Sequence, residues 1–300
     1  MTLRELIRRT ARRLRAARLH YGHGTGNPHD EAAWLVLRGL GRAFDADLDR
    51  PARAGRVDAL VERRIRERVP AAYLLGEAWL DGLAFHVDRR VIIPRSHIPF
   101  VLKHVRTAPR RILDLCTGSG CLAILAARAF PRAHVDAADI SSAALAVARK
   151  NVSRHRLGGR IRLIRSDLFA SLARETYDLI VSNPPYVTTR GMRALPPEYR
   201  YEPGIALAGG KDGLELVSRI LGEAPAHLRP GGLLVCEVGE GRAAIERAYP
   251  RLPLLWPQPE VFILAVARRR GASRTRSRRG QARRIGLGHD SLPAPNSSQP

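Results

Sequence analysis

Four consecutive residues, Asn183-Pro184-Pro185-Tyr186, have the types and order needed to activate a planar nitrogen. An amide nitrogen is a poor nucleophile because its lone pair is delocalised. The side-chain oxygen of Asn183 and the carbonyl of Pro184 can accept both N–H groups and direct the lone pair at an electrophilic methyl group. The prolines fix φ and donate no N–H, which holds the carbonyl in place, and Tyr186 can stack on a planar group. Rate would then come from positioning and electrostatics, with no obligatory acid or base.

This segment also has a simpler interpretation, because Asn-Pro-Pro is a common turn sequence. Its position favours the chemical interpretation, since it directly follows the strand sequence YDLIVS and ligands of open α/β sheets bind at the carboxyl ends of strands. The segment does not decide between the side-chain amide of glutamine and the exocyclic amine of a nucleobase, because both are planar nitrogens.

A glycine-rich turn follows an earlier strand, in the segment ILDLCTGSGC. Asp114 lies at the end of that strand, and Gly118 and Gly120 lie in the turn, where glycine lets the backbone approach a ligand and the next helix offers unpaired amides. The sequence GSGCLA also fits the dinucleotide pattern GxGxx(G/A), with Asp139 about 20 residues further on. A nicotinamide-dependent dehydrogenase therefore has to be considered.

Three aspartates at successive strand ends favour S-adenosylmethionine over a dinucleotide. Asp114 can face the sulfonium and amino groups of this donor, whereas a pyrophosphate would be repelled there. Asp139 can accept both ribose hydroxyls, and Asp167 is placed to meet the adenine amine. Each aspartate alone could be a helix cap or turn residue, but three in succession indicate an adenosine site. We expect S-adenosylmethionine as the methyl donor and no metal.

The elements that position these residues alternate between strands and helices from residue 110 onward. The expected strands are RRILDL, HVDAADI, IRLIRSD, YDLIVS, GGLLVCEVG and EVFILAVA, and the expected helices are LAILAARAF, SAALAVARKNVSRH, GLELVSRILGEAPAHL and AAIERAY. This alternation predicts an α/β fold with a mostly parallel sheet and helices on both faces. The expected domain spans residues 96–267.

Residues 1–75 predict a small helical domain, and residues 76–95 predict a hairpin that links it to the sheet. The Arg-rich start could imitate a transit peptide, but its apolar residues fall at helical spacing. Asp30 is the expected cap of a helix over EAAWLVLRGL, and Pro70 stops the helix in RVDALVERRIRERV. The hairpin would turn at Asp81-Gly82.

The chain is strongly basic, with a net charge of +23 over 300 residues. This charge suggests an acidic partner, of which nucleic acid is the commonest, although an Arg-rich solvated surface explains it equally well. Residues 268–300 hold nine Arg and one acid, Asp290, among many Gly, Ser and Pro. They predict a disordered basic tail.

Cysteine and histidine usage gives no sign of a metal or disulfide framework. The three cysteines are Cys116, Cys121 and Cys236. No pair has zinc-finger spacing and an odd number suits no disulfide framework, so a reducing, cytoplasmic setting is expected. Three histidines lie close together in YGHGTGNPHD, but no Cys or acid completes a familiar metal spacing. The sequence contains no run of 18 apolar residues, so no membrane span is expected.

These segments together resemble the bacterial protein-(glutamine-N5) methyltransferases, which pair a helical N-terminal domain with a Rossmann-like class I methyltransferase domain carrying NPPY. YGHGTGNPHDEAAWLVL (21–37), RVPAAYLLGEAWLDGLAFHVDRRVIIPRSHI (68–98) and LDLCTGSGCLAI are similar to the branch that acts on large-subunit ribosomal protein L-three. In the second of these, Ser96-His97 follow Pro94-Arg95, where the release-factor branch typically has Pro-Glu-Thr. LPPEYRYEPGIALAGGKDGLELVSRIL (195–221) is similar to both branches.

The resemblance covers roughly residues 1–266 and implies methylation of a glutamine side-chain amide in the L-three protein. It implies that Asn183 to Tyr186 hold the glutamine, with Asn183, Pro184 and Tyr186 catalytic and Pro185 in the binding segment. The residues that it implies for donor contact are Thr117, Gly118, Ser119, Gly120, Cys121, Asp139, Leu168 and Asn183. Position 168 is often aromatic in the release-factor branch, and WPQPEVFIL lacks the Gly-Asp-Gly that often precedes the last strand.

Three alternatives stay open. The chain could methylate the glutamine of the release-factor Gly-Gly-Gln motif. It could instead methylate a nucleobase amine, using its charge for backbone affinity, although this requires a base-flipping pocket. A non-catalytic ribosome-assembly factor is the third, and the intact Asp114, Asp139, Asn183 and Tyr186 argue against it. The expected partners are the ribosomal protein and, through the basic surface and tail, bound rRNA; no membrane partner is expected.

Overall fold

The computed structural model describes residues 1–267 and divides them into two compact units. The first unit comprises Met1–Arg95 and Leu195–Pro203, and the second comprises Ser96–Ala194 and residues 204–267. The expected basic tail, residues 268–300, lies outside the described residues. In residues 1–267 no helix combines the length and the apolar character needed to cross a membrane.

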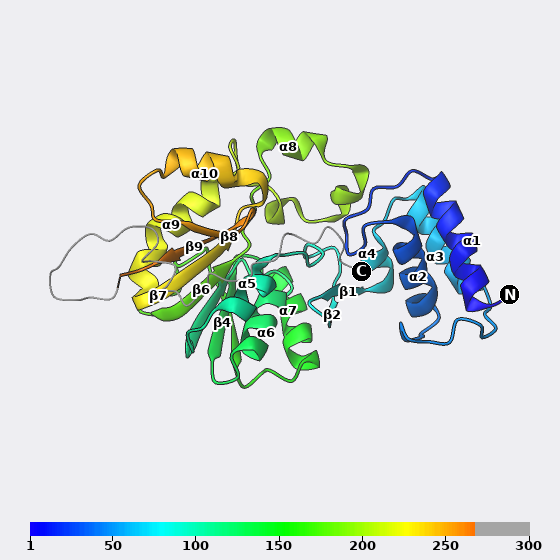
Figure 1. Ribbon diagram of the computed structural model, residues 1–300, viewed down its shortest axis with the longest axis horizontal. Coiled ribbons are helices and arrows are strands. Elements are labelled where there is room, and N and C mark those ends of the chain that lie inside the picture. The colour runs from blue at the N-terminus through cyan, green and yellow to red at the C-terminus, as the bar shows by residue number, and fades with distance from the viewer. Residues whose placement is uncertain (268–300) are drawn as a thin grey trace. The chain divides into compact units, whose positions relative to one another are not determined.

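The first unit begins with helices, as the sequence predicts (Figure 1). They are α1 (Leu3–Ala16), α2 (Pro28–Gly39), α3 (Gly55–Arg66) and the short α4 (Ala71–Leu75). A capping box begins α1: the Thr2 side chain accepts from the amide of Glu5 at 3.2 Å, and the amide of Thr2 donates to the Glu5 carboxylate at 2.8 Å. The Arg-rich start of the chain is therefore an ordinary helix that packs its apolar face into this unit.

The expected cap of α2 is wrong. Asn27, and not Asp30, is the N-cap: its side-chain oxygen accepts from the amides of His29 and Asp30, both at 3.0 Å. Pro28 occupies the first turn, where its missing N–H costs nothing. The helix therefore begins three residues earlier than the apolar pattern alone suggested, and Asp30 lies inside it, near the positive end of the helix dipole.

The expected hairpin is confirmed as β1 (Glu77–Leu80) and β2 (Leu83–His86), which pair antiparallel from Glu77↔His86 to Leu80↔Leu83. Asp81 and Gly82 form the two-residue turn with φ of 49° and 75°. Positive φ at both central residues gives a turn whose twist matches that of the strands, which is why Asp-Gly is a strong hairpin signal.

Residues 195–203 belong to the first unit although they lie between two parts of the second in the sequence. They include the short 3-10 helix η1 (Pro197–Tyr201). Glu198 of η1 is fully buried against Arg64 of α3, which is 1% exposed. The Arg64 guanidinium donates to Glu198 at 3.2 Å, to Glu31 at 2.7 Å and to the carbonyl of His20 at 2.8 Å. One buried cation thus joins α2, α3 and η1.

The second unit is built on a seven-stranded sheet. Its strands are β3 (Arg111–Leu115), β4 (His134–Asp139), β5 (Ile161–Arg165), β6 (Tyr177–Ser182), β7 (Leu228–Glu237), β8 (Leu255–Gln258) and β9 (Val261–Ala265). They lie in the order β5-β4-β3-β6-β7-β9-β8, and β9 is the one strand of this sheet that runs opposite to the other six. This confirms the α/β class and the Rossmann-like class I methyltransferase sheet; the pattern missed the edge strand β8.

Helices cover both faces of the sheet (Figure 1). One face carries α5 (Ile98–His104), α6 (Cys121–Ala129) and α7 (Ser142–Arg154), and the other carries α9 (Glu215–His227) and α10 (Arg242–Ala248). The α9 face packs on a buried cluster that includes Leu115, Ala138 and Cys236. The short helices α5 and α8 (Thr189–Ala194) were not expected.

The buried cluster around Arg64 gives the first testable prediction. Replacing Arg64 by Ala leaves the buried carboxylate of Glu31 without its cation and leaves Glu198 with Arg68 alone. We expect the free energy of unfolding to fall by about 3–5 kcal/mol in urea titrations. The control is Arg12→Ala, because Arg12 is exposed on α1 and its loss should cost no more than about 0.5 kcal/mol. Equal losses in the two variants would contradict the structural role of the cluster.

Candidate active site

The register of the sheet brings the expected site residues to one edge. Leu115 of β3 pairs with Ala138 of β4 and with Ser182 of β6, and Ser182 pairs in turn with Cys236 of β7. The next position along each strand is therefore Asp139 on β4, Asn183 after β6 and Glu237 on β7. Because side chains alternate between the faces of a strand, this next row points away from the α9 face and toward the face that α6 covers.

The glycine turn between β3 and α6 is bent as the sequence suggests. Gly118 and Gly120 have φ of 53° and 79°, which side chains other than glycine rarely adopt. A Cβ at Gly120 would lie 3.1 Å from the Cβ of Ala148, whereas a Cβ at Gly118 would meet nothing within 4 Å. Gly120 thus allows α6 and α7 to pack closely, and Gly118 leaves open backbone at the edge of the sheet.

Asn151 of α7 supports this turn and was not anticipated. It is fully buried, and its side-chain amide donates to the carbonyl of Ser119 at 2.9 Å. Ser119 itself is 3% exposed. The expected contact of Ser119 with the donor can therefore involve its backbone, while its carbonyl is fixed from the adjacent helix. An Asn in the middle of a helix gives no sequence signal for such a role.

Asp114 is fully buried at the end of β3 and keeps one oxygen without a partner. Its Oδ2 accepts from the Thr117 hydroxyl at 2.5 Å and from the amide of Ala123 at 2.9 Å. Its Oδ1 has no hydrogen-bond partner among the described residues. Burial raises the pKa of Asp114 to about 7, more than these two hydrogen bonds lower it. A buried carboxylate oxygen that lacks a partner is suited to a cationic ligand group.

Asp139 holds the open side of the glycine turn. Its Oδ2 accepts from the amide of Gly118 at 2.8 Å, and its Oδ1 accepts from the amide of Ser141 at 2.9 Å. Burial raises the pKa of Asp139, while these amides lower it. A carboxylate oxygen has two lone pairs, so each can also accept a hydroxyl. The expected contact of Asp139 with ribose hydroxyls is compatible with these hydrogen bonds and stays a prediction.

Asp167 and Leu168 are placed differently from the other expected donor contacts. Asp167 is half exposed and pairs with Arg219 of α9 at 3.1 Å. The Leu168 side chain is 5% exposed and packs in the apolar cluster under α9, with φ of 46° at its backbone. The structure thus gives both side chains protein partners, and their contacts with the donor stay a prediction.

The cysteines beside the turn have no nucleophilic character. Cys121 begins α6, and burial raises the pKa of its thiol to about 12. Burial also raises the pKa of Cys116. A thiol must ionise to attack, so these raised pKa values disfavour a nucleophilic role for either partly buried cysteine. The expected contact of Cys121 with the donor would then be a van der Waals contact of its side chain or a contact of its backbone.

The NPPY segment leaves the end of β6 and is fixed at its far side by backbone pairing. The amide of Val187 donates to the carbonyl of Leu207, and the amide of Gly209 donates to the carbonyl of Val187, both at 2.8 Å. The nineteen residues between Val187 and Leu207 form an excursion whose two ends are thereby held together. Pro184 and Pro185 are buried, and Asn183 is half-buried.

Three glycines that were not expected to belong to the site leave room for Tyr186. A Cβ at Gly209 would lie 2.6 Å from the Tyr186 Cα, and one at Gly213 would collide with its carbonyl oxygen. A Cβ at Gly239, in η3 (Gly239–Gly241), would lie 2.5 Å from Cε2 of the ring. The orientation of Tyr186 thus depends on the absence of side chains at these positions, which a single sequence does not reveal.

Glu237 is the site residue that the sequence analysis missed. It ends β7 in the same row as Asn183, is 3% exposed, and accepts from the Ser96 hydroxyl at 2.5 Å and from the amide of His97 at 3.1 Å. Burial raises its pKa. It fixes the Ser96-His97 pair just before α5. The available signal was a lone acid at the end of an otherwise apolar strand, GGLLVCEVG.

The histidines of the N-terminal loop are spread over different surroundings. His23 is buried and its ring contacts that of Tyr199 in a tilted arrangement, with 4.4 Å between centroids, whereas the side chain of His29 is mostly exposed. Burial lowers the pKa of His23 to about 4. Within residues 1–267, no group of three or more His, Cys, Asp or Glu side chains gathers in a way that could hold a metal ion.

The pKa of Asp114 gives a testable prediction about the donor. Because the carboxyl group is largely protonated below pH 7, the affinity for the cationic donor should rise from pH 5.5 to 7.5 as the carboxylate forms. Isothermal calorimetry would measure this. In Asp114→Asn the affinity should be lower and the rise should vanish. An equally steep rise in the variant would assign the pH dependence to another group.

Conversely, the raised pKa of Asp114 should make the free protein more stable in acid. The protonated form is favoured on folding, so this contribution is complete below the unfolded pKa of about 4 and is lost as the pH rises toward 7. In donor-free thermal melts, the Asp114→Asn variant should therefore gain stability relative to the parent chain as the pH rises over this range.

Comparison with known proteins identifies the family of the chain. Residues 99–195 match a family model described as the methyltransferase small domain. The chain is 52% identical over 269 residues to the ribosomal protein uL3 glutamine methyltransferase of Bordetella pertussis, which covers 85% of this chain and 90% of the relative. The protein of that name from Bradyrhizobium diazoefficiens is 47% identical over 291 residues, which cover 89% and 91%.

A solved methyltransferase structure from Pyrococcus furiosus aligns with 63% of this chain and 91% of its own, at 19% identity and a TM-score of 0.47. The sequence relatives match far more closely, over 85% and 89% of this chain. The chain belongs to the ribosomal protein uL3 glutamine methyltransferase family.

Proposed function

We propose that this chain transfers the methyl group of S-adenosylmethionine to the side-chain nitrogen of a glutamine in ribosomal protein uL3. The single observation on which this depends is the row of Asp139, Asn183 and Glu237 at the carboxyl edge of the sheet, beside the glycine turn. In this proposal the amide that binds the acceptor nitrogen and the carboxylate that binds the nucleoside lie on either side of β3 and its glycine turn. The names of the relatives supply the substrate.

The donor-binding residues fit a nucleoside with a cationic side arm. The unpartnered Oδ1 of Asp114 suits the cationic groups of the donor, and the two oxygens of Asp139 suit its ribose hydroxyls. The open backbone at Gly118 lets the ligand approach the turn. When bound, S-adenosylmethionine supplies a methyl group made electrophilic by a sulfonium. The turn from Thr117 to Cys121 shapes the space for it.

Asn183 and Pro184 would prepare the acceptor nitrogen. The side-chain oxygen of Asn183 and the carbonyl of Pro184 accept its two N–H groups, which fixes the plane of the glutamine amide and aims the nitrogen lone pair at the methyl. The N–C bond would form as the S–C bond of the sulfonium breaks and leaves a neutral thioether, and the same two oxygens would stabilise the positive charge that develops on the nitrogen. Tyr186, held by its glycine surroundings, limits where the amide plane can lie. The methyl group would pass directly from donor to acceptor, so no covalent enzyme intermediate is needed, and the nitrogen would then release one proton to solvent.

The cellular setting follows from the substrate class. A ribosomal protein and its rRNA are found in the cytoplasm of bacteria, and all three cysteines are free thiols. The basic surface suits a partner of opposite charge, so we include bound rRNA in the proposal as a companion of the protein substrate. The first unit, with its helices and residues 195–203, would recognise the substrate.

A direct assay separates this function from its competitors. Labelled S-adenosylmethionine is incubated with the chain and, separately, with uL3, a release factor and naked RNA, and mass spectrometry locates the label. We expect label on one glutamine of uL3. Label on the Gly-Gly-Gln motif would move the chain to the release-factor substrate, and label only on RNA would refute glutamine methylation.

The role of Asn183 is tested by Asn183→Ala. Losing one of two acceptors should raise the activation free energy by about 2.7–4 kcal/mol, if it resembles loss of one transition-state hydrogen bond elsewhere. Calorimetry should show that donor binding is partly kept. Asn27→Ser is the matched control, because it replaces an asparagine that caps α2 with another capping residue. Turnover at the parent rate in Asn183→Ala would rule out the amide clamp.

A further inference from the structure

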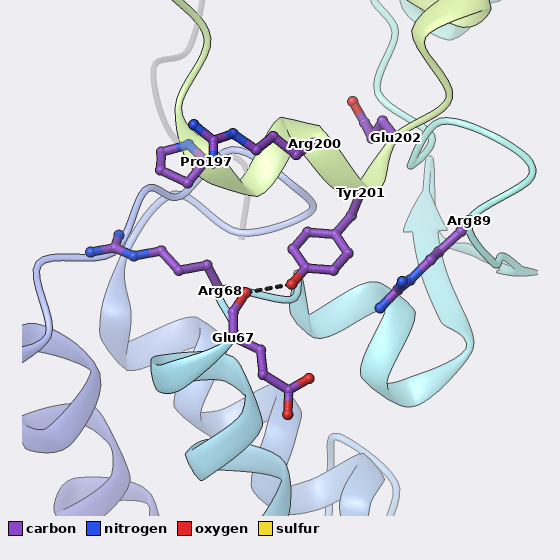
Figure 2. Close-up of a pocket in the computed structure, with 7 residues that line it drawn as sticks. All are labelled: Glu67, Arg68, Arg89, Pro197, Arg200, Tyr201 and Glu202. Atoms are coloured by element: carbon purple, nitrogen blue, oxygen red, sulfur yellow. Dashed lines mark hydrogen bonds between the residues drawn. The ribbon is translucent and has the colours of Figure 1, made fainter.

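The first unit contains a pocket of about 540 Å3 that has no part in methyl transfer as described above. Figure 2 shows Tyr201 at its centre, between the arginine side chains of the wall. The wall combines the end of α3, the loop after β2 and residues 197–202. Arg68, Arg89, Arg200, Tyr201, Glu67 and Glu202 all line it. We call it the arginine pocket.

The two carboxylates of the arginine pocket are already paired. Glu202 is buried and accepts from Arg95 at 2.6 and 2.7 Å, and also from the amide of Ile93 at 2.9 Å. Glu67 lies 3.5 Å from Arg63, one turn earlier on α3. The negative charge of the wall is therefore offset within the protein, and these acids do not repel an anion from the pocket.

Two of the arginines keep their charge available. Arg68 shares the carboxylate of Glu198 and donates to the carbonyl of Arg18, both at 3.2 Å. Arg89 and Arg200 are exposed, and no ion pair with a carboxylate of residues 1–267 is found for either. Two uncompensated guanidinium groups at one pocket favour a polyanion, because guanidinium binds phosphate through paired N–H groups.

Tyr201 offers a fixed aromatic surface beside these charges. Its hydroxyl donates to the carbonyl of Glu67 at 2.5 Å, which holds the ring in place and uses its polar end internally (Figure 2). The guanidinium of Arg89 lies 4.5 Å from the ring centroid, in cation–π contact. An aromatic ring backed by arginine is a stacking surface for a nucleobase, and this combination is used by proteins that bind single strands.

We propose that the arginine pocket binds single-stranded RNA, with Arg89 and Arg200 on backbone phosphates and a base against Tyr201. This partner rests on the proposed function, since a ribosomal protein substrate is accompanied by rRNA. An acidic peptide would supply anions for the arginines, but a run of acidic side chains lacks the aromatic bases that stack on a tyrosine ring. RNA supplies both, so the chemistry of the pocket favours it.

The test is RNA binding by the full chain, measured by fluorescence anisotropy with a labelled oligouridine at several salt concentrations. In Arg89→Gln/Arg200→Gln, affinity should fall roughly tenfold, and the slope of log K against log salt should become shallower by about 1.4, at about 0.7 per phosphate contact on a single strand. Tyr201→Leu should weaken binding without changing that slope, because stacking releases no counterions.

The matched control is Arg12→Gln/Arg53→Gln, which removes the same charge from two exposed arginines of the first unit outside the pocket. It should bind RNA within about twofold of the parent chain. Equal losses in the two double variants would show that only total charge matters and would overturn the pocket. Stronger competition by polyglutamate than by RNA would overturn the choice of partner. Because no methyl transfer is measured, failure of this proposal is distinct from failure of glutamine methylation.

Discussion

The alignment of Leu115, Ser182 and Cys236 in one row of the sheet is the constraint on which the site depends. Strand register in a parallel sheet moves in steps of one residue, and a shift by one residue sends each side chain to the opposite face. Cys236 and Leu115 are held in register by the apolar cluster under α9. The polar residues that follow them must then emerge together on the other face. The hydrophobic core thus determines where Asn183 and Glu237 lie.

The same edge of the sheet also contains buried acidic side chains, whose burial does not favour the stability of the fold. Asp114, Asp139 and Glu237 all have pKa values raised by burial, which means that their ionised forms are destabilised by their surroundings. Asp139 and Glu237 recover part of this cost through backbone amides and the Ser96 hydroxyl. Asp114 accepts hydrogen bonds at only one of its oxygens, so less of the cost of its burial is offset. Perturbed carboxylates gathered at one sheet edge are typical of a ligand site.

The fold of the second unit and the strand-end residues could be predicted because both depend on local signals. Apolar runs, turn glycines and acids that end a strand are visible in the sequence. What could not be predicted depends on contacts between distant segments. Glu198 meets Arg64 across 134 positions, and Asn151 supports Ser119 from another helix. The cap at Asn27 depends on local contacts. Asp30 was the expected cap because it lies closer to the apolar residues of the helix.

Residues 188–206 show why such long-range contacts matter for function. The ends of this excursion are held together by the pairing of Val187 with Leu207 and Gly209, directly beyond Tyr186. Its middle is buried in the first unit through Glu198 and Glu202, which lie four residues apart and bind different arginines. If η1 were displaced, both carboxylates would lose their arginine partners. A buried charge without a partner strongly destabilises the folded state. The segment that follows NPPY therefore has its middle held in the first unit by ion pairs and its ends held together by backbone hydrogen bonds.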